Sequence, residues 1–435
     1  MKRFGFRMIT VLLAVLMTVA LCGCEVEVAV ATLPQQGTTV TTVTTANGDQ
    51  WDGAGKLTTV ATTTTTVATL PSTTEKAYQT LATIAHDAKY VNDYGIYHVL
   101  KGYCFGKVYS LAEWLPVVGY VKDGKIVDAL YTATTIMPSP VNTYWGDFNT
   151  KAEWDAWREH TYKNLDTLNE AAGEVQKALS LKEHKVKVFL TLVNPQNAAD
   201  NPTYYDNWGS LDGTTMDVSN NEHRLTMLRY MVDSYLSEFA AKGYENVELA
   251  GFYWFDEYVV QDDLSFYQSF TDYIRSKGKI TMISPYYKAT GWTLCGDAGF
   301  DLHSMQSNYF PTMKIGSMNC GSDKRLPANA ALINNGQIGG IEMEMDTHNV
   351  KDAITGWKKT MKVGVETGIV NGYHVHYFGG GPGSPYALAT STDPYFRSCY
   401  DELYKYMHNT LTVSEIWLDP IEKEQEIMDG ASDWV

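Results

Sequence analysis

The feature that most limits the fold of this chain is an alternation of apolar, strand-like segments with longer helical patterns. The candidate strands lie at residues 115–121, 127–133, 186–193, 247–254, 280–285, 301–308, 339–345 and 369–378. Helical patterns occupy residues 151–181, 221–242, 261–277, 324–335 and 350–367. Such alternation is typical of a parallel sheet covered by helices. Eight strands can close a barrel, so we expect an α/β fold of the (β/α)8, or TIM barrel, class over residues 77–428.

The first two candidate strands fit this pattern least well. Residues 121–125 resemble a hairpin turn rather than the beginning of a crossover helix. A barrel distorted or partly open at its first two strands is therefore an alternative. Residues 429–435 are expected to form a C-terminal tail.

The N-terminus has the pattern of an export signal. Lys2, Arg3 and Arg7 precede an apolar run at residues 8–21, which is too short to favour a bilayer span. The following Leu-Cys-Gly-Cys resembles the lipobox of bacterial lipoproteins, which implies cleavage after residue 23 and diacylglyceryl attachment to Cys24. We therefore expect an exported protein that is lipid-anchored on the outer face of the bacterial cytoplasmic membrane. A plain secretory signal is the alternative.

Residues 24–76 are dominated by threonine and contain few large apolar side chains. Such a segment cannot bury enough surface to offset the entropy of ordering. We expect a disordered tether that holds the folded part away from the membrane surface, an arrangement that suits a polymeric substrate.

The net charge of the chain excludes one class of binding partner. The formal net charge is -16, and losing residues 1–23 would remove three cations and no acid, leaving -19. No basic stripe of the kind that nucleic acids require is present, so we expect no nucleic-acid partner. We expect a carbohydrate substrate, a membrane contact through the lipid only, a monomer, and no cofactor. The cysteines beyond Cys24 match no zinc-site spacing and are expected to be small buried residues.

Two strand-like segments run directly into carboxylates. Residues 251–257 end in Asp256 and Glu257, and residues 339–346 contain Glu342 and Glu344. Burying an unpaired acid costs several kcal/mol, so these side chains need a partner or a use. In one parallel barrel both strand ends would reach the C-terminal face, where such barrels keep their active sites. Two facing carboxylates are what glycosidic-bond cleavage requires.

The positions of these acids in the strand order indicate a different catalytic role for each of them. Glu257 follows the fourth candidate strand and Glu344 ends the seventh, which resembles the acid/base and nucleophile placement of the large clan of (β/α)8 retaining glycosidases. Glu342 and Glu344 share one face of a strand, about 7 Å apart, so Glu342 is either a supporting acid or the nucleophile itself. At the position before the acid/base, that clan usually has asparagine, whereas this chain has Asp256. The alternative for all these acids is structural pairing with Arg or Lys, or helix capping.

Further polar and aromatic residues lie near the ends of the candidate strands. Sugar sites combine amide and hydroxyl hydrogen-bonding groups with aromatic platforms, and we expect substrate contacts from Asn194, Trp254, Asp256, Tyr286, Tyr287, Trp292, Gln306, Asn308 and Tyr309. Trp254 and Trp292 are the expected stacking residues, and Tyr309 is the expected neighbour of the nucleophile. With 29 tyrosines and 11 tryptophans in the chain, a core position is the alternative for any one of them.

His374 and His376 fall on one face of the last candidate strand. We expect them to contact substrate or to belong to the core. An HxH pair on a barrel strand can also hold a divalent metal, which would indicate a metal-dependent hydrolase or deacetylase instead. No second histidine-rich strand supplies partners, so we expect no metal.

Four segments taken together resemble a known family. Residues 251–257, 284–292, 299–309 and 340–346 are similar to the bacterial domain-of-unknown-function family numbered 4855, and the likeness extends over about residues 90–406. The resemblance implies a secreted or surface protein with a glycoside hydrolase-like TIM barrel and a poorly defined activity. The sequence thus favours a surface-anchored retaining glycosidase acting on an extracellular glycan. A non-catalytic glycan-binding lipoprotein is the main alternative.

Overall fold

The computed structural model describes residues 28–30, 41–43, 94–139, 150–181, 184–195, 208–312, 314–315, 318–345 and 352–418. The chain divides into two units, residues 1–73 and residues 74–435. In the first unit, β1 (Val28–Val30) pairs antiparallel with β2 (Thr41–Val43), where the sequence predicted no strand. The predicted signal peptide, Cys24, the rest of the tether and the C-terminal tail lie outside the described residues.

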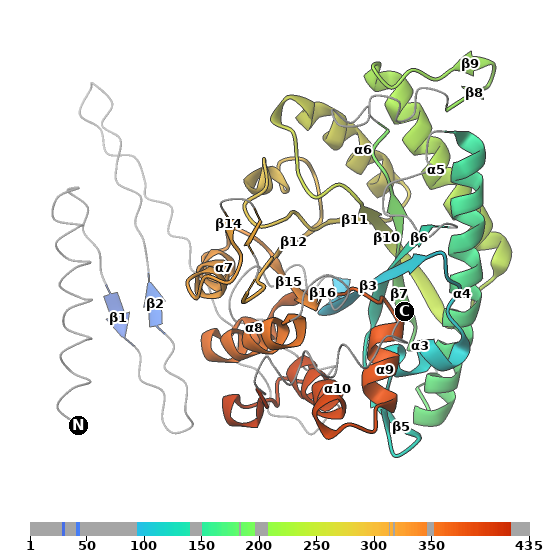
Figure 1. Ribbon diagram of the computed structural model, residues 1–435. Coiled ribbons are helices and arrows are strands. Elements are labelled where there is room, and N and C mark those ends of the chain that lie inside the picture. Colours follow the sequence, from blue (N-terminus) through green and yellow to red (C-terminus); the bar gives the residue numbers. More distant parts are fainter. Residues whose placement is uncertain are drawn as a thin grey trace, which may run out of the picture. The chain divides into compact units, whose positions relative to one another are not determined.

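The second unit contains a closed barrel of eight parallel strands, drawn in Figure 1 with its surrounding helices. In chain order the strands are β3 (His98–Phe105), β6 (Ala133–Ser139), β7 (Val186–Leu192), β10 (Val247–Trp254), β11 (Ile280–Ile283), β12 (Leu302–Gln306), β15 (Gly340–Met345) and β16 (Tyr373–Phe378). Pairing of β16 with β3 closes the sheet. The predicted (β/α)8 barrel is confirmed.

The first two predicted strands are wrong. Residues 115–121 belong to α3 (Leu111–Val118) and β4 (Gly119–Lys122), and residues 127–133 overlap β5 (Lys125–Ala129). β4 and β5 form an antiparallel hairpin outside the barrel sheet, so the predicted turn between them is correct. A capping box in which Ser110 and Glu113 bond each other's backbone N–H begins α3 and sets the apolar residues that follow on a helix.

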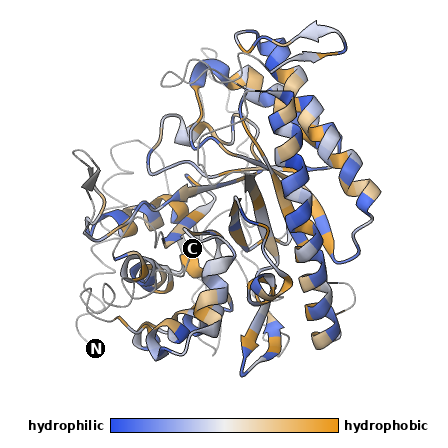
Figure 2. Cartoon of the chain, turned by 45° about the vertical axis from the view of Figure 1, so that its right-hand side comes forward, coloured by the Kyte–Doolittle hydropathy of each residue, from blue (hydrophilic) through white to orange (hydrophobic). Residues whose placement is uncertain are grey.

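The five predicted helices are present. They are α4 (Lys151–Leu179), α5 (Asn221–Lys242), α6 (Leu264–Ser276), α7 (Arg325–Asn334) and α8 (Ala353–Thr367), and they are followed by α9 (Gly383–Thr390) and α10 (Pro394–Met407). Thr150 and Glu153 form a capping box on α4, and the Asn220 side chain caps α5. Figure 2 shows hydrophilic and hydrophobic residues mixed along the long helices, as expected for helices with one face on a sheet and the other in water.

Short elements occupy the connections. They are β8 (Ser210–Leu211), β9 (Thr214–Thr215), η2 (Gln261–Asp263), η3 (Trp292–Leu294), β13 (Lys314–Ile315), β14 (Met318–Asn319), η4 (Ile369–Asn371) and η5 (Val413–Glu415). The connection from β11 to β12 contains η3 in place of an α-helix. No helix among the described residues is both long and apolar enough to cross a membrane.

Two apolar clusters hold the barrel together. One fills its interior and includes Val99, Phe189, Tyr253 and Met282. The larger one lies between the strands and the helices. The cysteines at 104, 295, 320 and 399 are buried, and none of them forms a disulfide within the described part of the chain. The barrel interior is therefore a packed core, and the polar side chains near its mouth need a separate explanation.

Candidate active site

A buried lysine lies at the centre of the acidic cluster. Side chains alternate along a strand, so Lys101 of β3 points into the barrel with Val99 and Tyr103, which belong to the interior cluster. Lys101 is 1% exposed to solvent. The ammonium Nζ lies 2.8 Å from Glu342 Oε2 and 3.6 Å from Glu257 Oε1. One cation thus contacts carboxylates from the fourth and the seventh strands of the barrel.

These two contacts limit how far apart the carboxylates lie. Two oxygens that touch one nitrogen at 2.8 and 3.6 Å are separated by no more than the sum of those distances, about 6.4 Å. Retaining glycosidases hold their two carboxyl groups about 5–5.5 Å apart, and inverting ones about 6.5–9.5 Å. This limit applies to one oxygen of each carboxyl group and is compatible with either range.

Glu342 is buried in β15, where the Ser284 hydroxyl at the end of β11 donates a hydrogen bond to it. Ser284 in turn shares a hydrogen bond of 2.8 Å with Ser304 of β12. Burial raises the pKa of Glu342 and the nearby Glu257 raises it further, while the Lys101 ammonium opposes both effects. Burial alone would lower the pKa of Lys101, but the Glu342 carboxylate raises it well above its ordinary value.

Glu344 has a separate set of partners on the β12 side of the mouth. Ser307 Oγ donates to its Oε2 at 3.0 Å, and Asn308 donates to it from both its backbone N–H and its side-chain amide. Burial raises the pKa of Glu344 to about 8, and the Glu342 charge adds to the rise, whereas these hydrogen bonds and the more distant Lys101 lower it. Glu344 therefore gains a proton more readily than an ordinary glutamate.

Asn308 organises this side of the mouth. Its backbone φ is +39°, in the left-handed region that few non-glycine residues adopt. Its amide also donates to Gln306 Oε1 at 3.0 Å, and its Oδ1 accepts the Tyr287 N–H at 2.8 Å. A strained residue that satisfies several partners is typical of a functional site.

Glu257 connects the cluster to the surface. Its side chain is 38% exposed, in contrast to the buried Glu342. The Glu257 carbonyl accepts the Tyr286 N–H at 3.1 Å, which ties the ends of β10 and β11 together, and Tyr286 is 39% exposed. Glu257 is thus the acid of this cluster that solvent reaches most easily.

Asp256 points to the other side of the same strand end. It accepts a hydrogen bond of 3.0 Å from Asn194, whose Oδ1 accepts one of 2.9 Å from Arg224 of α5. The Arg224 guanidinium lies 3.9 Å from the Phe266 ring centroid. Burial raises the pKa of Asp256 to about 6, and the Asn194 hydrogen bond opposes the rise. The predicted substrate residues Asn194 and Asp256 thus lie together in a chain that anchors the end of β10.

The predicted aromatic platforms lie in different settings. Trp254 is buried behind β10 against Tyr267 and Phe270, not in the mouth. Trp292 lies in η3 and packs against the outer core. Tyr309 is 2% exposed.

Tyr287 has two cations close to its ring. It is half-buried near Tyr286, with the Arg325 guanidinium 4.3 Å and Lys288 Nζ 5.5 Å from its ring centroid. Tyr286 and Tyr287 thus lie at the end of β11 beside Glu257, whose carbonyl accepts the Tyr286 N–H.

His374 and His376 lie on the outer face of β16, because Tyr373, Val375 and Tyr377 of that strand fill the barrel interior. His376 Nε2 lies 3.1 Å from His98 Nδ1, and His374 Nε2 lies 2.9 Å from the Tyr406 hydroxyl of α10. Burial and the neighbouring histidines lower the pKa values of His98 and His376 well below normal. In the described ranges no three His, Cys, Asp or Glu side chains are grouped to hold a metal ion. The pair thus lies in the core under α10.

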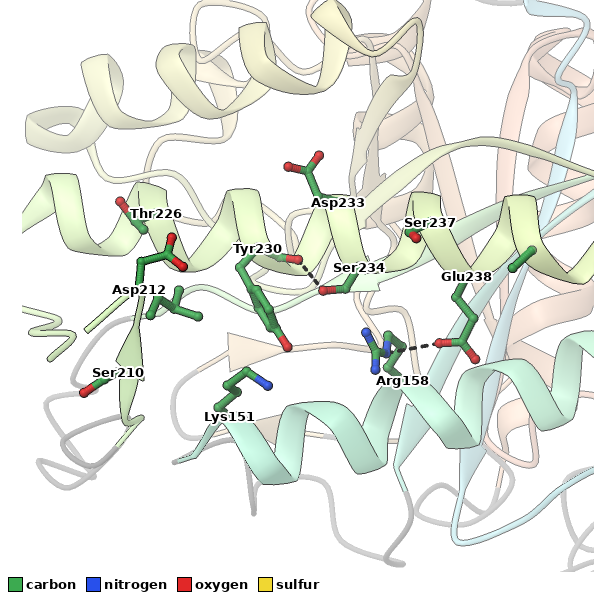
Figure 3. A pocket seen from close by; sticks show the side chains of 12 residues that line it. Lys151, Arg158, Ser210, Asp212, Thr226, Tyr230, Asp233, Ser234, Ser237 and Glu238 are labelled. Atoms are coloured by element: carbon green, nitrogen blue, oxygen red, sulfur yellow. Dashed lines mark hydrogen bonds and ion pairs between the residues drawn. The ribbon is translucent and has the colours of Figure 1, made fainter. Parts of the chain in front are cut away.

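An open groove of about 900 Å³ lies on the outer surface between α4 and α5, beside the β8–β9 hairpin (Figure 3). Both cations in its lining pair with acids. Arg158 Nε lies 3.2 Å from Glu238 Oε2, and Lys151 Nζ lies 2.8 Å from Asp155 Oδ2. Because both cations of the groove are already paired with acids, the groove gives no comparable reason to expect chemistry.

Sequence reasoning missed four contributors to the site: Lys101, Ser284, Ser307 and Arg224. Lys101 carried a usable signal, because it is a lone cation in the apolar run His-Val-Leu-Lys-Gly-Tyr-Cys-Phe. A buried charge in a strand needs a partner as much as Glu342 does. The two serines carried no signal, since serine is common at strand ends.

Comparison with known proteins identifies the family. The model of the family described as "Domain of unknown function (DUF4855)" matches residues 105–405. The chain belongs to this family, which confirms the resemblance seen in the sequence. No curated protein matches the chain.

Several solved structures are similar at low identity. A GH5 xyloglucanase of Bacteroides ovatus in complex with a heptasaccharide is 10% identical, with 85% of this chain and 86% of that chain covered and a TM-score of 0.40. A GH5-4 endoglucanase of Clostridium acetobutylicum is 11% identical, with coverages of 68% and 91% and a TM-score of 0.37. At these scores the likeness carries no argument about activity.

Proposed function

We propose that this protein is a glycoside hydrolase in which Glu257 is the general acid/base and Glu342 is the nucleophile. The observation that carries the proposal is the shared contact with Lys101, which brings one oxygen of a partly exposed carboxylate within about 6.4 Å of one oxygen of a buried carboxylate at a barrel mouth. Cleavage of a glycosidic bond needs two carboxyl groups at this kind of separation.

The contacts support Glu342 over Glu344, although the sequence favoured Glu344. A nucleophile must be ionised, and Lys101 at 2.8 Å favours the charged form of Glu342. Burial raises the pKa of both glutamates, but Lys101 opposes the rise directly at Glu342 and only from a distance at Glu344. Its bonds to Ser307 and Asn308 suit a group that shapes the mouth beside the nucleophile.

We propose net retention in two steps, because the strand-end acids resemble those of the retaining (β/α)8 glycosidases. In the first, a Glu342 oxygen bonds to C1 of the sugar, the bond from C1 to the leaving oxygen breaks, and that oxygen takes the Glu257 proton. In the second, Glu257 takes a proton from water, the water oxygen bonds to C1, and the bond from C1 to Glu342 breaks. Both carboxyl groups return to their starting states.

The proposed setting is the outer face of the cytoplasmic membrane, with anchorage through Cys24. It is supported by the sequence pattern of residues 1–24 and by the threonine-rich segment that follows. We propose an extracellular polysaccharide or glycan as the substrate and a monomer as the working form. A tethered enzyme at the surface would meet such polymers directly.

A non-catalytic glycan-binding protein is the second candidate. The observation in its favour is that the Lys101–Glu342 pair is fully buried, as a purely structural ion pair would be. The third candidate is a metal-dependent hydrolase that uses His374 and His376. No observation supports it, because these two side chains lie on the outer face of β16.

The test is incubation of the purified mature chain with a panel of plant, mucin and microbial glycans, with products read by mass spectrometry. We expect released oligosaccharides from at least one glycan class. Saturable binding without any release would favour the glycan-binding alternative. Neither binding nor release across the panel would contradict both.

A further inference from the structure

We propose that Lys101 is a positioning residue that acts as a counter-ion shared by Glu342 and Glu257 and changes partner as negative charge passes between them. This inference deepens the proposed function and rests on it. It follows from the place of the ammonium between the two carboxylates, at 2.8 Å from one and 3.6 Å from the other.

The charges of the two glutamates alternate during the proposed reaction. Before the first step Glu342 is a carboxylate and Glu257 carries a proton. After it, Glu342 is a neutral ester and Glu257 is a carboxylate. In each state the cluster contains one of these anions and one ammonium, so its net charge does not change. A single cation within reach of both oxygens can therefore stabilise both states with only a short movement.

The environment of Lys101 makes this role possible. Among the described residues, the titratable groups that act on it are Glu342 and Glu344 from β15, Glu257 and Tyr253 from β10 and its end, and Tyr103 from its own strand. Its Nζ lies 5.4 Å from the Tyr253 ring centroid, where the face of the ring can stabilise a cation. If Lys101 served only as the partner of Glu342, the Glu257 carboxylate at 3.6 Å would have no role beside it.

The structure also offers a matched control. Lys358 of α8 forms a second buried ion pair, 2.9 Å from Glu402 of α10, with side chains 0% and 6% exposed. This pair lies between helices and not in the barrel interior. Lys358→Met removes a buried cation as Lys101→Met does, but it leaves the glutamates of the mouth unchanged.

The experiment is the pH profile of kcat/KM for the wild type, Lys101→Met and Lys358→Met, on the glycan that the panel identifies. The acid limb reports ionisation of the carboxyl group that must be charged, Glu342. Removing the Lys101 ammonium raises the pKa of this group, so the acid limb should move to higher pH by about 1–3 units. Lys358→Met should not move the acid limb.

An unchanged acid limb in an active, folded Lys101→Met variant would overturn the inference and leave the proposed function standing. Absence of hydrolysis by the wild type would overturn the proposed function and this inference with it.

A measurement on the wild type covers the case in which Lys101→Met does not fold. In a crystal structure of the glycosyl-enzyme trapped with a 2-fluoro glycoside of the identified sugar, Lys101 Nζ should lie about 2.7–2.9 Å from Glu257. Lys101 still bonded to Glu342, with Glu257 no closer than 3.6 Å, would contradict the shared counter-ion.

Discussion

Replacing Glu257 by Gln should lower kcat by about 10²–10⁴-fold, because loss of a general acid removes proton transfer to the leaving group. Replacing Glu342 by Gln should cost more, at least about 10⁴-fold, as loss of a nucleophile does in other hydrolases. The measurement is steady-state hydrolysis of the glycan that the panel identifies, at a temperature where circular dichroism shows each variant folded.

Two controls separate chemistry from packing. Glu402→Gln also removes the anion from a buried lysine, Lys358, and should leave kcat within a few-fold of wild type. Glu344→Gln changes a carboxyl group that shapes the mouth beside the nucleophile, and it should cost less than Glu342→Gln. Full activity in Glu257→Gln or Glu342→Gln would remove the assigned role of that residue.

Lys101→Met should lower the free energy of unfolding by about 3–5 kcal/mol, because it leaves the Glu342 carboxylate buried without its cation. Adding Glu342→Leu should recover most of that loss, since apolar pairs of similar volume often replace buried ion pairs without cost. The measurement is a double-mutant cycle by urea unfolding of the single and double variants.

A surface pair serves as the reference for this cycle. Lys277 lies 2.9 Å from Asp233 with both side chains partly exposed, so Lys277→Met should change the free energy of unfolding by no more than about 1 kcal/mol. If the losses from Lys101→Met and Glu342→Leu add to within about 0.5 kcal/mol, the two side chains are not energetically coupled. The buried pair would then not be the link between β3 and β15 that the contacts indicate.

The barrel could be predicted because most of its strands are apolar runs separated by amphipathic helices. β3 was missed because its inward Lys101 and outward His98 interrupt the apolar pattern. The reason that Lys101 is tolerated there lies in Glu342, far along the chain, and no local pattern reveals such a partner. The apolar end of α3 resembles a strand, and the Ser110 capping box upstream is the local signal that marks it as a helix.

The acids could be located because carboxylates after apolar strands are rare and costly. The direction in which side chains point was harder to predict. Tyr253 fills the barrel interior, so Trp254 must face the helices, and the same alternation returns Glu257 to the interior. His374 and His376 share one face of β16, as predicted, but only the packing of the alternate residues in the barrel interior and of α10 outside shows that it is the outer face.

The choice between Glu342 and Glu344 also depended on contacts between strands. Both residues are buried in β15, and two residues apart they share one face. They differ in their neighbours, since Lys101 and Ser284 contact Glu342 whereas Ser307 and Asn308 contact Glu344. Such neighbours come from other strands and are not visible in a local pattern.

The most direct test of the central claim is to find which residue becomes covalently attached to the sugar. Glu257→Ala should accumulate a glycosyl-enzyme when it is given an activated aryl glycoside of the identified sugar, because the good leaving group needs no acid and the second step lacks its base. Peptide mapping by mass spectrometry should place the added sugar on Glu342. An adduct on Glu344, or hydrolysis with inversion and no adduct, would contradict the pairing of Glu257 with Glu342.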